Sequence, residues 1–269
     1  MDQHTPPRNS IRRSFMQGTP LTRLLYINVG AYLIFLLLQL LSWLTGIDDA
    51  GQLLLQYLGV PSDLTRLARA PWTPLTYMFA HTGFFHLLFN MLWLYLFGAI
   101  FQQQLSGRGL TAVYLFGGLA GAGAYILLYN QLPAFEILRP TSAVIGASGA
   151  VMAIVFAVCT TFPKHTVQIP FIGRTRLIYL ALFTLVVNLI SIPQGNSGGH
   201  IAHLGGALFG CIFSLATRRK QLDPGQPRRK KHTVKKVSEM TDREYNIRRR
   251  KKDDRINEIL DKISRSGYN

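Results

Sequence analysis

The chain has 269 residues, of which 48% are hydrophobic and 16% charged, and its formal net charge is +16. Soluble domains average about 25% charged residues. The charge is concentrated at one end, because residues 218–269 hold 26 charged side chains and residues 24–217 hold 11. A uniformly charged globule is therefore excluded. A disulfide framework is excluded as well, since the only cysteines, Cys159 and Cys211, lie in apolar runs.

Six apolar stretches fill the middle of the chain. The first, LLYINVGAYLIFLLLQLLSWLT, meets the requirement of about 20 apolar residues for a membrane span. It is too long and too far from Met1 for a cleaved signal peptide. A buried core helix could explain any one stretch, but not six with hardly a charge inside. We therefore predict an all-α membrane protein with six transmembrane helices, over residues 24–45, 82–104, 110–130, 148–162, 174–192 and 200–217.

Lys and Arg in the connections predict the orientation, because cytoplasmic loops carry an excess of both. The N-terminal arm, the loop containing Arg108, the loop between the fourth and fifth spans and the tail are basic, whereas the opposite side carries three Arg and four acidic residues. Both termini are therefore expected in the cytoplasm, which agrees with six crossings. The first outer connection, residues 46–81, contains three prolines and Trp72, and we expect it to be partly embedded.

Three parts follow from this pattern. Residues 1–22 form a cytoplasmic N-terminal arm, residues 23–217 a six-helix membrane domain, and residues 218–269 a basic cytoplasmic tail that is mostly disordered. Basic clusters beside a final span suit anionic lipid. Nucleic acid is the other partner that such clusters suggest. No folded nucleic-acid motif accompanies them, so we expect lipid at the tail and no nucleic acid.

Polar residues gather at the starts of three spans, where they are costly in a membrane and indicate function. They are His81, His86 and Asn90 in the second, Gly146-Ala147-Ser148-Gly149 in the fourth, and His200 and His203 in the sixth. These three spans run in the same direction, so we expect His86, Ser148 and His203 at a similar depth. Gly206 and Gly210 are four residues apart, a spacing that permits close helix approach. This approach would bring Ser148 to His203.

These residue types suit acyl transfer. A serine hydroxyl needs a base to become a nucleophile, and histidine is the natural base. His86 and Asn90 share one helix face, and with the backbone N–H of Ser148 they can donate hydrogen bonds to an oxyanion. No carboxylate lies in the spans, so the arrangement predicted is a Ser148–His203 dyad rather than a triad. No metal or cofactor is expected. The sequence identifies no residue that would orient the base.

The residues also match a known family. The matching stretches are WTPLTYMFAH at 72–81, HLLFNMLWLYLFG at 86–98, GASG at 146–149 and AHLGG at 202–206. Over residues 20–217 the chain resembles the rhomboid intramembrane serine proteases. The resemblance implies a six-helix bundle with a hydrated cavity open to the outer side. It also implies Ser148 as nucleophile, His203 as base, and His86, Asn90 and the Ser148 backbone around the oxyanion.

Further implications concern the substrate. The resemblance implies a lateral route for a substrate transmembrane helix, a mobile fifth helix, and a cap from residues 193–199. Two positions depart from the family pattern. Thr73 follows Trp72 where the family often has Arg, and Met152 stands one helical turn after the serine where many members have Tyr. Neither change removes a reacting group.

Other functions fit the sequence less well. A transporter is disfavoured because no charged side chain lines the spans, and a zinc protease because its H-E-x-x-H motif is absent at His81 and His86. A catalytically inactive rhomboid-like protein that binds membrane clients is the remaining alternative, although such a relative would normally lack Ser148 or His203. We predict a serine endopeptidase of the bacterial cytoplasmic (inner) membrane that cleaves transmembrane protein substrates near the outer membrane face.

Overall fold

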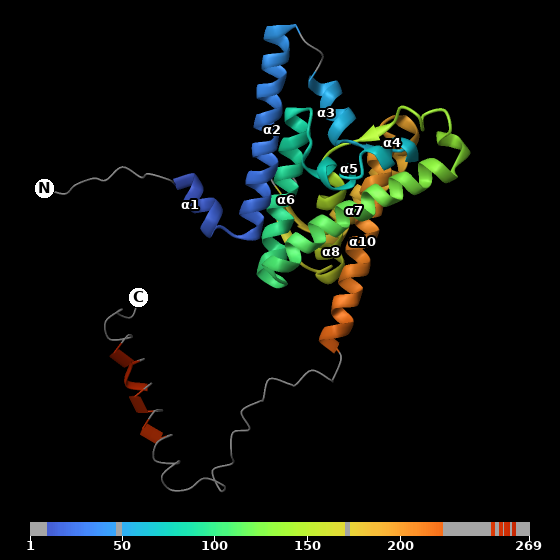
Figure 1. Ribbon diagram of the computed structural model, residues 1–269. Coiled ribbons are helices and arrows are strands. Elements are labelled where there is room, and N and C mark those ends of the chain that lie inside the picture. Colours follow the sequence, from blue (N-terminus) through green and yellow to red (C-terminus); the bar gives the residue numbers. More distant parts are fainter. Residues whose placement is uncertain are drawn as a thin grey trace, which may run out of the picture. The chain divides into compact units, whose positions relative to one another are not determined.

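The computed structural model describes residues 10–46, 50–169 and 173–222, with a few residues between 249 and 261. The chain separates into two units, Met1–Gln221 and Leu222–Asn269. The first unit contains the helical bundle (Figure 1). Most of the predicted basic tail, residues 218–269, lies outside the described residues, so its predicted disorder and lipid binding stay predictions.

Within the described residues, five helices are long and apolar enough to cross a membrane. They are α2 (Pro20–Thr45), α6 (Phe84–Gln104), α7 (Gly107–Gln131), α9 (Leu177–Ser191, continued by η3, Ile192–Gln194) and α10 (Ser197–Leu222). They correspond to the first, second, third, fifth and sixth predicted spans. The predicted all-α membrane bundle is therefore confirmed. The six-span count and the cytoplasmic position of both termini remain predictions.

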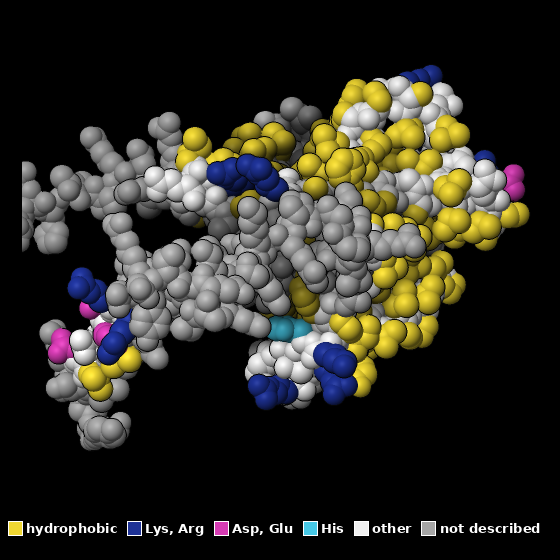
Figure 2. Space-filling view, turned by 90° about the horizontal axis from the view of Figure 1, so that it is seen from below, with side chains coloured by type: hydrophobic (Ala, Val, Ile, Leu, Met, Phe, Trp, Pro, Cys, Tyr) yellow, Lys and Arg dark blue, Asp and Glu magenta, His cyan; other side chains and the backbone are white. Residues whose placement is uncertain are grey.

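The outside of the bundle is apolar, as lipid requires. Only 22% of the most apolar window of helix α2 is buried, and Leu33, Ile34 and Trp43 are each more than half exposed. Hydrophobic side chains cover much of the bundle surface that is visible in Figure 2. Helix α2 begins where Thr19 accepts a hydrogen bond from the Thr22 N–H, and Pro20 occupies its first position. A short helix, α1 (Ser10–Gln17), precedes it.

Helix α8 (Ser148–Thr161) differs from the other spans in length and burial. Its 14 residues rise about 21 Å, which is less than the bilayer hydrocarbon core of about 30 Å. Ten of the 14 residues are buried, and the helix packs against α6, α7 and α9. Irregular backbone at membrane depth is tolerated where protein buries it. The short helix is therefore entered through the non-helical segment that follows β2 (Ala143–Val144) and begins at Ser148 inside the bundle.

Glycines hold α8 tightly against α10. A Cβ atom added at Gly206 would collide with the backbone carbonyl of Gly149, and one at Gly210 would collide with that of Ala153. Only hydrogen at these positions permits such an approach of two helix backbones. The predicted close packing of the fourth and sixth spans is thus confirmed.

The first connection is a series of short elements rather than a simple loop. It contains α3 (Ala50–Leu58), β1 (Val60–Pro61), α4 (Leu64–Arg69), α5 (Thr73–Thr76) and η1 (Tyr77–Phe79). Its end is anchored in the bundle, because the buried Tyr77 hydroxyl donates to the Gly118 carbonyl at 2.6 Å and the Tyr114 hydroxyl donates to the Met78 carbonyl at 3.1 Å. The connection is thus packed rather than a simple loop, and its partial embedding in the membrane stays a prediction.

A two-stranded antiparallel pair ties this connection to the chain that enters α8. Strand β1 pairs with β2 (Ala143–Val144), with Val60 opposite Val144 and Pro61 opposite Ala143. The β2 strand follows η2 (Pro133–Phe135) and lies four residues before Ser148. The connection and the start of α8 are therefore one packed assembly.

A β-hairpin lies between α8 and α9, where the sequence indicated a loop. Strand β3 (Thr166–Ile169) pairs with β4 (Gly173–Arg176), with Thr166 opposite Arg176. The fifth span was predicted from residue 174, but α9 begins at Leu177, because residues 173–176 pair with β3 and the Leu177 N–H donates to the His165 carbonyl. The hairpin signal was weak because β3 and β4 have only four residues each.

The packing of α8 on α10 generates a stability prediction. Gly206→Ala should lower the free energy of unfolding by roughly 1–3 kcal/mol, because the new methyl group must push two helix backbones apart. The measurement is equilibrium unfolding of the full chain in detergent. Gly30→Ala is the matched control: it lies within α2 with no atom near its added Cβ, so it should be neutral or stabilising. Equal stability of both variants would contradict the packing described.

Candidate active site

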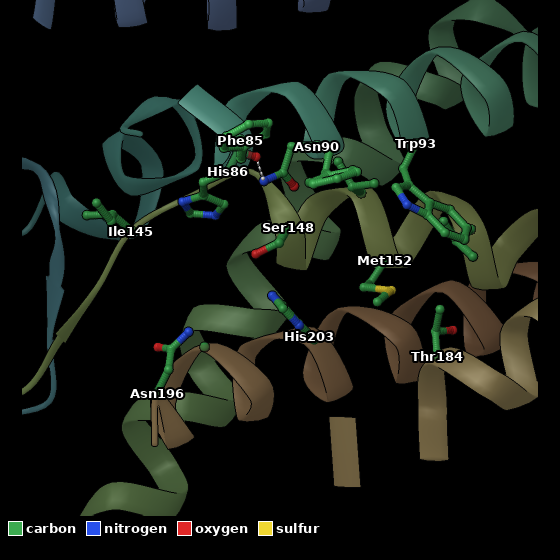
Figure 3. A pocket seen from close by; sticks show the side chains of 14 residues that line it. Phe85, His86, Asn90, Trp93, Ile145, Ser148, Met152, Thr184, Asn196 and His203 are labelled. Carbon is green, nitrogen blue, oxygen red and sulfur yellow. Dashed lines mark hydrogen bonds between the residues drawn. The ribbon is translucent and has the colours of Figure 1, made fainter. Parts of the chain in front are cut away.

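Side chains from α6, α8, α9 and α10 line a cavity of about 400 Å³. Ser148 and His203 lie next to one another in it, with His86 and Asn90 on the facing helix α6 (Figure 3). The structure thus brings all four residues predicted from the sequence to one cavity. Its lining residues are Phe85, His86, Phe89, Asn90, Trp93, Ile145, Ser148, Val151, Met152, Val155, Thr184, Asn196, Gly199 and His203.

Ser148 is the first residue of α8, and the segment before it is held by the first connection. The Gly146 N–H donates to the Tyr77 carbonyl at 2.8 Å, and the Ala147 N–H donates to His81 Nε2 at 3.3 Å. The N–H groups of a helix's first turn have no partner within the helix, and they lie at the positive end of its dipole. The backbone N–H of Ser148 is therefore placed to stabilise negative charge beside its own hydroxyl.

Gly146 makes room for the imidazole of His86. Its φ of +117° is a conformation that residues with a side chain rarely adopt. A Cβ atom at this position would lie 2.7 Å from His86 Nε2 and 3.7 Å from the Ser148 hydroxyl oxygen. The His86 ring and the serine hydroxyl therefore converge on the same small space.

Asn90 lies one turn along α6 from His86, as their spacing predicted. Its Nδ2 donates to the His86 carbonyl at 2.8 Å, and the side chain is only 7% exposed. An amide nitrogen carries two hydrogens, so this bond leaves a second donor at the cavity. The internal bond also fixes the direction of the amide.

His81 contacts two residues next to Ser148 and in the cavity, Ala147 and His86, and the sequence did not reveal these contacts. It is buried, its ring lies edge-on to that of His86 with 5.1 Å between the ring centres, and its Nε2 accepts the Ala147 N–H. Burial, with a smaller contribution from His86, lowers the pKa of His81 to about 4. The ring is therefore neutral at physiological pH and can accept this hydrogen bond.

His203 has a polar partner that sequence reasoning missed. Its Nδ1 lies 2.6 Å from Oδ1 of Asn188 on α9, and Nδ1 of His200 lies 2.9 Å from the same oxygen. The available signal was a strongly polar amide in the otherwise apolar segment LIYLALFTLVVNLIS. Two ring contacts join the histidines at this end of the bundle, one between His81 and His86 and one between His200 and His203.

The two departures from the family pattern have distinct surroundings. Met152 lines the cavity. Thr73 is buried, and its hydroxyl donates to the Ala70 carbonyl at 2.8 Å. Thr73 therefore closes the turn before α5.

The fold and the cavity define a multi-pass helical membrane protein with a serine–histidine site. The model of the Rhomboid domain matches residues 68–220, which is more than half of the chain. The chain belongs to the rhomboid family.

Curated relatives agree with this membership. RHOMBOID-like protein 12, mitochondrial, of Arabidopsis thaliana is 30% identical over 156 residues, which cover 55% of this chain and 46% of that protein. Presenilin-associated rhomboid-like protein, mitochondrial, of Homo sapiens is 33% identical over 146 residues, or 50% of this chain and 35% of that protein. Rhomboid-like protein 17, chloroplastic, of Arabidopsis thaliana is 25% identical over 152 residues, or 53% and 47%. The chain spans less than half the length of these relatives.

The predicted location in a bacterial cytoplasmic membrane is wrong by this comparison. The relatives carry mitochondrial or chloroplastic names and point to the membranes of eukaryotic organelles. Composition and motifs indicate that the chain spans a membrane, but they do not indicate which membrane it is. The multi-pass character stands, because it follows from the helices themselves.

The contact at Gly146 generates a second prediction. Gly146→Ala should destabilise the protein more than Gly195→Ala, because both residues have φ of +117° but only the methyl group at 146 meets a side chain, His86. In each variant the positive φ at the new alanine lowers the free energy of unfolding, on the order of 1–2 kcal/mol. Thermal unfolding in detergent measures the difference. Equal losses in both variants would show that His86 does not fill this space.

Proposed function

We propose that the protein is an intramembrane serine endopeptidase with Ser148 as nucleophile and His203 as general base. The observation that carries the proposal is the meeting of Ser148, His203, His86 and Asn90 at one cavity of a rhomboid-family bundle. A serine hydroxyl, a neutral base and oxyanion donors are the set that acyl transfer needs.

In the proposed reaction, Nε2 of His203 takes the proton of the Ser148 hydroxyl as its oxygen attacks the scissile carbonyl carbon. The tetrahedral oxyanion accepts hydrogen bonds from the Ser148 backbone N–H, from Asn90 Nδ2 and from the His86 ring. The imidazolium then gives its proton to the leaving amine, and the peptide C–N bond breaks. His203 next takes a proton from a water molecule as the water oxygen attacks the acyl carbon. The bond from that carbon to the Ser148 oxygen then breaks, the imidazolium returns its proton to this oxygen, and the acyl group leaves as a carboxylic acid.

The proposed substrates are transmembrane proteins. The cavity is lined mainly by apolar side chains, among them Phe85, Trp93, Met152 and Val155. Such a lining suits an apolar residue of a substrate segment, while the polar groups gather around Ser148. Cleavage is proposed near the membrane face at which α6, α8 and α10 begin.

Cleavage of a single-span reporter protein by the purified full chain in detergent tests this proposal. Ser148→Ala and His203→Ala should each abolish cleavage, because each removes a reacting group. Unchanged cleavage by either variant would overturn the dyad. A folded wild type that binds the reporter without cutting it would instead indicate an inactive client-binding protein. Cleavage lost to chelators but insensitive to fluorophosphonates would indicate metal chemistry.

The oxyanion donors give a graded prediction. Loss of one donor costs about 10²–10³-fold in kcat where few donors carry the charge. His86→Ala and Asn90→Ala should each slow cleavage by less than this, because three donors share the oxyanion. Leu92→Ala is the control, since this residue lies on the same helix with its side chain 55% exposed. Rates equal to wild type in both donor variants would exclude His86 and Asn90 as donors to the oxyanion.

A further inference from the structure

The imidazole of His203 is held from the side opposite its reacting nitrogen. Its Nδ1 lies 2.6 Å from Oδ1 of Asn188, a residue that is only 6% exposed. The amide atom that faces His203 is the oxygen, because the amide nitrogen, Asn188 Nδ2, donates to the Thr184 carbonyl at 2.8 Å. The amide is thus oriented by its own helix, with its oxygen turned to the histidines.

This contact selects one tautomer of the base. An amide oxygen only accepts hydrogen bonds, so Nδ1 of His203 must carry the hydrogen, and Nε2 then has a free lone pair. A free lone pair on Nε2 is what a base needs to take the proton of Ser148. With the opposite tautomer, Nε2 would carry a hydrogen and no proton could be accepted there.

We propose that Asn188 is a positioning residue for the general base, holding His203 in the Nδ1–H tautomer with Nε2 available to Ser148. The inference rests on the proposed protease function, and it adds a third side chain to the Ser148–His203 pair. A neutral amide thereby does the orienting that a carboxylate does in a Ser-His-Asp triad. The apolar spans offer no carboxylate for this purpose.

His200 strengthens the arrangement. Its Nδ1 lies 2.9 Å from the same Asn188 oxygen, and its ring is edge-on to that of His203 with 5.8 Å between the ring centres. One amide oxygen has two lone pairs and can accept from both rings. The oxygen is therefore fixed between two imidazoles, and its freedom to turn away from His203 is reduced.

The position of Asn188 on α9 has a consequence for the base. The buried residues of α9 are Leu177, Ala181 and Asn188, and the remainder of the helix is half-buried or exposed. Asn188 is thus the buried polar contact by which α9 reaches α10. His203 keeps this orientation only while α9 holds Asn188 within hydrogen-bond distance of it.

Three variants of the full chain separate positioning from packing. Asn188→Ala removes both amide bonds, whereas Asn188→Asp keeps an acceptor for His203 and loses the donor to Thr184. Val187→Ala is the control on the same helix, with a side chain that is 42% exposed.

With the reporter protein, Asn188→Ala should lower kcat on the order of 10–10²-fold with KM little changed. This is less than the about 10⁴-fold loss when a triad carboxylate is replaced. Asn188→Asp should recover most of the rate. Equal losses in the Ala and Asp variants would overturn the proposal.

The tautomer itself gives a readout that does not require cleavage. Nitrogen-15 NMR of histidine-labelled full chain, with His203 identified by comparison with His203→Gln, reports which ring nitrogen carries the hydrogen. We expect Nδ1–H in wild type and Asn188→Asp, and a mixture in Asn188→Ala. The same tautomer in Asn188→Ala as in wild type would overturn the proposal. The Nδ1–H result in a wild type that cuts no reporter would refute the protease function and leave the positioning role intact.

Discussion

The close contact between α8 and α10 is the constraint on which the site depends. Gly206 and Gly210 let the backbone of α10 touch that of α8 at Gly149 and Ala153. Because Ser148 begins α8 and His203 lies one turn before Gly206, the same contact that packs the helices brings Ser148 and His203 to one cavity. Van der Waals packing of small residues drives helix association in membranes. The packing of the bundle and the geometry of the cavity therefore depend on the same few glycines.

The second requirement is a protected start for α8. The backbone before Ser148 is not helical, and irregular backbone inside a membrane bundle needs hydrogen-bond partners. The first connection supplies them through β1, the Tyr77 carbonyl and His81. The connection thus provides the hydrogen bonds that water would otherwise make with the segment before Ser148. Its burial explains why a loop between two spans contains so many short, packed elements.

Much of this could be predicted from the sequence because the signals were local. Apolar length located five spanning helices, and polar residues in an apolar background indicated His86, Asn90, Ser148 and His203. The partners of these residues could not be predicted, since His81 with Ala147 and Asn188 with His203 are pairings across helices without a fixed spacing. The β3–β4 hairpin was missed because each strand has only four residues, too few for a clear alternating pattern. The location in a bacterial membrane was wrongly predicted, because apolar spans do not indicate which membrane they occupy.

The central claim is that the Ser148 hydroxyl is activated by His203, and covalent labelling tests it most directly. The purified full chain is treated with a fluorophosphonate, and the modified peptide is identified by mass spectrometry. The account predicts one adduct on Ser148 in the folded wild type and a strongly reduced rate of labelling in His203→Ala. Labelling of another serine, or labelling of Ser148 at an unchanged rate in His203→Ala, would contradict it.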